Sequence, residues 1–83
     1  MIEVTIEMPE GALAALHLEP HGFAQELRLA AAVKWYELER VSQGRAAEIA
    51  GVSRNEFIEA LGRYKVSPFQ YSADEILAEA TRE

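Results

Sequence analysis

The stretch that decides the fold is "RAAEIAGVSRNEFIEAL", residues 45–61, because it has the outline of two short helices joined by a tight turn. A helix-turn-helix needs small residues where its helices cross, and three alanines supply them: Ala46, Ala47 and Ala50. It also needs a residue that tolerates positive φ, which is Gly51, and an apolar residue after it, which is Val52. The pattern therefore predicts helices over about residues 43–50 and 54–64.

In a helix-turn-helix that reads DNA, the N-terminal residues of the second helix approach the base edges. Here Arg54 would pair with a guanine edge and Asn55 with an adenine edge, beside the capping residue Ser53. Phosphate contacts would come from three basic residues of the same segment: Arg45, Arg63 and Lys65. Two glutamates of the second helix oppose such contact, so the alternative is a helical hairpin that keeps the shape and binds no DNA.

The distribution of charge bears on this choice, because phosphate contacts supply much of the affinity for DNA. The net charge of the 83 residues is −6. Residues 1–39 hold seven acids and two bases, and residues 66–83 hold four acids and one base. Residues 40–65 hold five bases and three acids and form the one basic segment. A surplus of two charges is small, and a dimer would double it.

The N-terminus reads as a half-buried β-strand. In "IEVTIEM", residues 2–8, the apolar residues Ile2, Val4 and Ile6 alternate with polar ones, and a proline follows. A lone strand leaves its backbone unpaired, so we expect it to pair across a two-fold axis as an antiparallel ribbon. Ile2, Val4 and Ile6 are therefore the predicted dimerisation residues, while the glutamates on the other face disfavour reading of DNA by the ribbon.

A short helix over residues 10–18 and a long helix over about residues 20–41 follow the strand. Pro20 suits the first position of the long helix, which carries a wide apolar stripe of the kind found at a subunit interface. The expected fold is mainly α: an N-terminal β-strand in an intersubunit ribbon, a long helix, a helix-turn-helix and a short C-terminal helix. Residues 1–65 would form the dimerisation and DNA-binding domain.

Residues 66–83 read as a C-terminal tail. An extended segment precedes a capping box, Ser72 with Glu75, which opens a last helix to about residue 81. The tail is acidic and amphipathic, and four apolar residues are candidate anchors in the groove of a partner protein: Phe69, Tyr71, Ile76 and Leu77. The alternative is a small helix that closes the domain's own core.

Other classes of function have little support. The chain has no cysteine, and Pro20 separates His17 from His21, so no metal site and no cofactor are expected. No nucleophile motif or phosphate loop is present, and an enzyme is not expected. No run of about 18 apolar residues and no signal peptide are found, so the expected location is the cytoplasm, with no membrane partner.

Three stretches, "VTIEMPE", "LRLAAAVKWYE" and "GRAAEIAGVSRNEF", make nearly the whole chain resemble a family of small, uncharacterised prokaryotic proteins. Members of that family are regarded as predicted antitoxins with a helix-turn-helix, often found beside PIN-like ribonuclease toxins. The resemblance implies an antitoxin-like transcriptional regulator, a homodimer that binds its own promoter through residues 45–65 and neutralises a toxin nuclease with its tail. The alternative is a protein–protein interaction module with a structural helix-turn-helix and no DNA binding.

Overall fold

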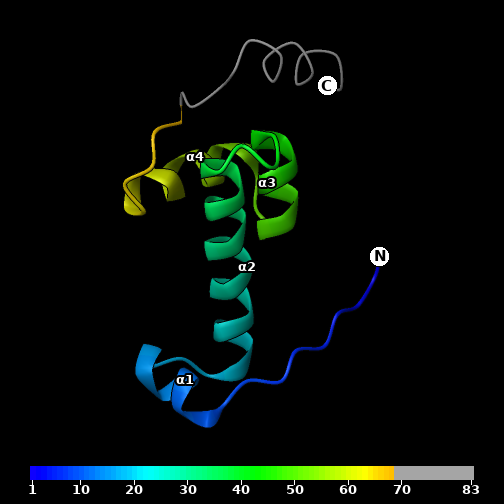
Figure 1. The fold of residues 1–83 in the computed structure, drawn as a ribbon, viewed down its shortest axis with the longest axis vertical. Helices are drawn as coiled ribbons and strands as arrows, with labels where there is room; N and C mark the ends of the chain where they lie inside the picture. Colours follow the sequence, from blue (N-terminus) through cyan, green and yellow to red (C-terminus); the bar gives the residue numbers. More distant parts are fainter. Residues whose placement is uncertain (69–83) are drawn as a thin grey trace.

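The computed structural model describes residues 1–68, which form four α-helices (Figure 1). They are α1 (Glu10–Leu16), α2 (Pro20–Glu37), α3 (Gln43–Ala50) and α4 (Arg54–Arg63). The long helix α2 runs along the length of the molecule and connects its two ends (Figure 1). Helices α3 and α4 lie at its C-terminal end, and α1 lies at its N-terminal end (Figure 1). No described helix is long and apolar enough to cross a membrane.

All four described helices end in the same way, with one residue in the left-handed region. These residues are His17, Glu39, Gly51 and Lys65, with φ of 55°, 60°, 75° and 58°. After each, the next backbone N–H reaches back five residues, as in Val52 to Ala47 (3.1 Å) and Val66 to Leu61 (2.9 Å). This is the Schellman arrangement, which satisfies the last carbonyls of a helix. The left-handed Glu39 ends α2 at Glu37, so the long helix stops before the predicted residue 41.

The core lies between the C-terminal half of α2 and the two helices packed against it. Tyr36, Phe57 and Leu61 are its largest fully buried side chains. The rings of Tyr36 and Phe57 meet edge to face, with centroids 5.8 Å apart and planes at 89°. Small side chains let α3 approach α2 closely, since Ala32 and Ala46 are both fully buried.

The predicted N-terminal β-strand is wrong, and the intersubunit ribbon built on it falls with it. Residues 1–9 run as an extended segment with no strand assigned, and all of them are exposed. Ile2 is 91% exposed, Val4 75% and Ile6 59%. A strand is defined by pairing, and no other extended segment lies against this one among residues 1–68. Alternation of apolar and polar residues predicts two faces, but it cannot supply the neighbouring strand.

The predicted C-terminal helix, to about residue 81, lies outside the described residues. The partner-binding candidates Phe69, Tyr71, Ile76 and Leu77 lie there too.

Candidate nucleic-acid interface

Both helices of the α3–α4 pair begin at a capping serine. The Ser42 hydroxyl accepts a hydrogen bond from the Arg45 N–H (3.2 Å) at the start of α3. At the start of α4, the Ser53 hydroxyl accepts from the Glu56 N–H (3.1 Å), and the Glu56 carboxylate accepts from the Ser53 N–H (2.9 Å). This reciprocal pair is a capping box, which satisfies two otherwise unpaired donors. Two capped helices joined by a short turn therefore form where the sequence predicts them.

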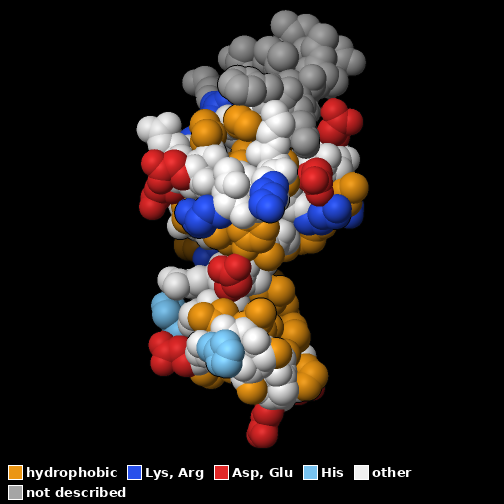
Figure 2. All heavy atoms as spheres, turned by 90° about the vertical axis from the view of Figure 1, so that its left-hand side faces the viewer, with side chains coloured by type: hydrophobic (Ala, Val, Ile, Leu, Met, Phe, Trp, Pro, Cys, Tyr) orange, Lys and Arg blue, Asp and Glu red, His pale blue; other side chains and the backbone are white. Residues whose placement is uncertain are grey.

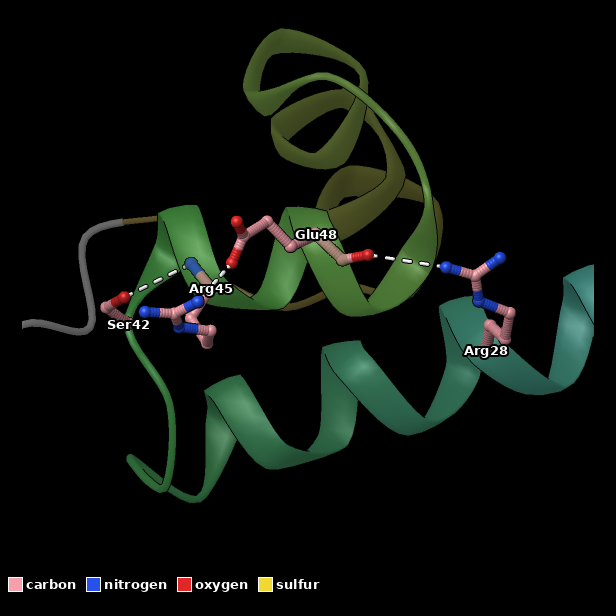
Figure 3. Close-up of polar contacts among 4 residues, drawn as sticks. All are labelled: Arg28, Ser42, Arg45 and Glu48. Carbon is pink, nitrogen blue, oxygen red and sulfur yellow. Dashed lines mark hydrogen bonds and ion pairs between the residues drawn. The ribbon is translucent and has the colours of Figure 1, made fainter. Parts of the chain in front are cut away.

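Arg28 of α2 holds the end of α3 from outside the motif. Its Nε donates to the Ile49 carbonyl (2.8 Å), and its Nη2 donates to the Glu48 carbonyl (3.4 Å). Figure 3 shows the side chain reaching from α2 to the last turn of α3. A cation at a helix C-terminus also interacts favourably with the helix dipole. A Cβ at Gly51 would lie 3.0 Å from this guanidinium, so both the space and the positive φ favour glycine.

The predicted phosphate contacts are exposed and lie at both ends of the motif. Arg45 forms an ion pair with Glu48 across one turn of α3 (2.6 Å), and both side chains are more than half exposed (Figure 3). Such a surface pair contributes about 0–1 kcal/mol, so a phosphate can compete for Arg45. Arg63 ends α4 and Lys65 follows it, and both are exposed.

The predicted base-reading residues lie together at the start of α4. Ser53 is the helix cap, and its hydroxyl is used by Glu56. Asn55 is exposed, whereas Arg54 is half-buried and its Nε donates to the Gln43 Oε1 (2.9 Å). The hydrogen bonds from the Ser53 backbone and hydroxyl hold the pKa of the Glu56 carboxyl below its ordinary value. Glu56 therefore stays ionised, but its carboxylate is turned back onto the cap.

The basic side chains of residues 1–68 are confined to one half of the described molecule (Figure 2). On the face in Figure 2, Lys and Arg side chains lie over the packed helices with acidic side chains among them, and the half around α1 shows none. The sequence agrees, because residues 1–27 contain no lysine or arginine.

Gln43 is the residue of this region that sequence reasoning missed. It is the first residue of α3 and is only 3% exposed, the one buried polar side chain among the described residues. Its Nε2 donates to the Pro68 carbonyl (3.5 Å), which also accepts from the Tyr36 hydroxyl (2.9 Å). A glutamine after a capping serine reads as an exposed first-turn residue, and its partners lie 11 and 25 residues away.

The predicted dimerisation residues line an apolar groove. Ile2, Val4 and Ile6 face the N-terminal half of α2, where Phe23 and Leu27 form the opposite wall. The groove is open to solvent and has a volume of about 790 Å³. Helix α1 has no buried residue, so this end of the molecule lacks a core of its own.

The described residues hold no group of three or more histidine, cysteine or carboxylate side chains that could bind a metal.

The comparisons with known proteins agree with each other. The profile of an uncharacterised protein family (UPF0175) matches residues 1–82. A protein of Aeropyrum pernix described as "UPF0175 protein" is 37% identical over 73 residues, which are 88% of this chain and 76% of that protein. No solved structure matches the chain significantly. The chain therefore belongs to the uncharacterised protein family UPF0175.

Proposed function

We propose that the chain is an antitoxin-like, DNA-binding transcriptional regulator that binds its own promoter and neutralises a toxin nuclease. The observation that carries the proposal is the capped α3–α4 pair with Gly51 in its turn and Arg54 and Asn55 at the start of α4. In a helix-turn-helix this is the position from which side chains reach base edges. The basic balance of residues 40–65 supports the same site, because phosphates attract cations.

Binding to the upstream DNA of its own gene tests this function directly. Fluorescence anisotropy across a salt series, with scrambled DNA beside it, should show preference for the upstream DNA and a steep dependence on salt. R54A should weaken binding to the upstream DNA by about 1–3 kcal/mol and reduce the preference. R63A should weaken binding to both DNAs alike and lower the salt slope by about 1.

Arg40 provides a matched control, because it is exposed and basic but lies outside the motif. R40A removes the same charge as R63A and should change binding less. Equal losses from R40A and R63A would mean general attraction to a basic surface rather than docking of α4. Absence of any preference in the wild-type chain would sink the proposal.

A specific observation favours the second candidate, a protein–protein interaction module that binds no DNA. Arg45 is paired with Glu48 and Arg54 is bonded to Gln43, so two of the proposed contacts already have protein partners. This candidate predicts that R54A and N55A leave DNA binding unchanged, while F69A or I76A abolishes binding to the partner protein.

A homodimer would strengthen DNA binding by placing two α4 helices on one duplex. The exposed Ile2, Val4 and Ile6 support association, because isolated chains rarely leave an apolar groove open to water. Sedimentation equilibrium should show a dimer that V4E dissociates. L38E is the matched control, because Leu38 is 55% exposed and does not line the groove. A monomeric wild-type chain would contradict this part of the proposal.

In this proposal the C-terminal tail, residues 66–83, neutralises the toxin. The tail is acidic, with four acidic residues and one basic residue. An acidic, apolar segment suits the basic cleft of a nuclease that binds RNA. Any PIN-like ribonuclease encoded beside this chain should lose ribonuclease activity when it is mixed with the chain. F69A and L77A should restore its activity, and undiminished nuclease activity in the presence of the wild-type chain would contradict this role.

A further inference from the structure

Gln43 joins three parts of the molecule through one buried amide. Its Oε1 accepts a hydrogen bond from the Nε of Arg54 (2.9 Å), and its Nε2 donates to the carbonyl of Pro68 (3.5 Å). A buried amide needs partners for its polar atoms, since an unsatisfied one is costly. Gln43 is the first residue of α3 and is 3% exposed, so the surrounding protein restrains its side chain.

The bond to Gln43 restrains the side chain that is proposed to read a base. Arg54 is the first residue of α4, and its guanidinium is planar. A hydrogen bond at Nε restrains the plane of that group and the torsions that lead to it. Arginine otherwise loses much side-chain entropy when it is ordered, so restraint before binding improves recognition of a planar base edge.

We propose that Gln43 is a positioning residue for Arg54: it orients the guanidinium at the start of α4 and thereby determines the preference of the protein for particular DNA. The inference rests on the proposed DNA binding and extends it to a residue that touches no DNA. The plain alternative is that Gln43 only satisfies the Pro68 carbonyl and stabilises the fold. Three substitutions distinguish the positioning role from the stabilising role. They can do so because the amide oxygen of Gln43 bonds Arg54, whereas its amide nitrogen bonds the Pro68 carbonyl.

Q43M keeps the approximate volume and removes both hydrogen bonds. Q43E keeps an acceptor for Arg54 but has no N–H to offer the Pro68 carbonyl. Y36F is the matched control, because it removes the other hydrogen bond to Pro68 (2.9 Å) and leaves the bond between Gln43 and Arg54 in place. Thermal melting by circular dichroism identifies the temperature at which every variant is folded, and binding is measured there.

The first measurement is the ratio of affinities for upstream and scrambled DNA. Q43M should lower this ratio about tenfold, the size of one lost base contact, with little change in affinity for scrambled DNA. The double variant Q43M/R54A should be no worse than R54A, because both remove one interaction. Q43E and Y36F should keep the wild-type ratio. A wild-type ratio in Q43M, or a loss in Y36F equal to that in Q43M, would overturn the inference.

The second measurement needs no DNA. The Nε–Hε signal of Arg54 in nitrogen-15 NMR spectra should be protected from exchange with water in the wild-type chain, in Q43E and in Y36F, and unprotected in Q43M. Equal protection in Q43M and wild type would overturn the positioning role while leaving the proposed function intact. A wild-type chain with no DNA preference would instead overturn the proposed function and the inference together.

Discussion

The two ends of the described chain contain similar residues and are packed very differently. Every buried hydrophobic residue among residues 1–68 lies at Ala32 or later, in the second half of α2, in α3, in α4 or at Val66. The first 31 residues contain Ile2, Val4 and Leu16, all more than half exposed. Apolar content is therefore not what distinguishes the ends. A core forms only where a second and a third helix cover the first.

The arrangement of the elements explains the difference. Around Tyr36, helices α3 and α4 both pack on α2, and their alanines allow close approach. At the other end, α1 has seven residues and none of them is buried. The segment before it lies along an open groove. The C-terminal end of the described chain thus contains the hydrophobic core, whereas the apolar side chains of the N-terminal end remain exposed on the surface.

The largest expected effect is a direct test of this contrast. F57A removes a fully buried ring that packs edge to face on Tyr36, and it should cost about 3–5 kcal/mol. F23A changes the same residue type in the groove wall, where the ring is only half-buried, and should cost about 1 kcal/mol. Urea unfolding followed by circular dichroism measures both. Equal losses, or a loss in F23A that grows with protein concentration, would show that the groove is covered in solution.

The second effect compares two glycines within the packed end. G51A forces alanine to φ +75° and places its Cβ 3.0 Å from the Arg28 guanidinium, so it should destabilise by about 1–2 kcal/mol. G62A lies inside α4 with open space around the added carbon, so it should stabilise by about 0.5–1 kcal/mol. Opposite shifts of the melting temperature are expected. A neutral G51A would mean that Arg28 does not hold the end of α3.

The local parts of the packed end could be predicted from the sequence. Ser42, Gly51 and Ser53 are short-range signals, each acting within four residues of itself, and they mark the two ends of α3 and the start of α4. Two of the residues that matter most to the site act over long range. The contact of Arg28 spans about 20 residues, and that of Gln43 with Pro68 spans 25, so no local pattern contains them.

At the N-terminal end, by contrast, a local sequence pattern predicts a strand that does not form. Its alternation of apolar and polar residues predicts a half-buried strand, yet residues 1–9 form no strand and all of them are exposed. A helix satisfies its backbone internally, whereas a strand needs a partner that lies elsewhere. The end of α2 was missed for a related reason, because Glu39 adopts a left-handed conformation that its residue type does not favour.

A smaller effect concerns the contact that fastens the end of α4 to the middle of α2. The Tyr64 hydroxyl donates to the Glu26 carboxylate (2.6 Å). Burial, followed by this hydrogen bond and the negative charge, raises the pKa of Tyr64 from 10.0 to about 12. Because the folded pKa is raised, the contribution to stability is fully present below pH 10 and is lost as pH rises toward 12.

Absorbance of the phenolate should therefore show a step near pH 12 from Tyr64, and Y64F should remove that step. The wild-type chain should lose stability between pH 10 and 12, and Y64F should not. The loss is on the order of 1 kcal/mol, because solvent screens this largely exposed contact. E26Q is the control, because it removes the charge and should move the titration of Tyr64 toward its ordinary pKa. An unchanged titration in E26Q would contradict the contact.

The smallest effect is expected at the exposed cap of α4, where the packed end meets solvent. The Ser53 backbone N–H and then its hydroxyl lower the pKa of Glu56 from 4.5, so the ionised carboxylate stabilises the folded state. With the folded pKa depressed, this contribution is present above pH 4.5 and is lost as pH falls through the lower folded pKa. E56Q keeps an acceptor for the Ser53 N–H and cannot titrate, so its urea midpoint should fall less between pH 7 and pH 3.

E59Q removes the same charge from an exposed position outside the capping box and should keep the wild-type dependence. If E56Q and wild type lose stability in parallel, the capping box contributes nothing to the acid sensitivity of the helix-turn-helix.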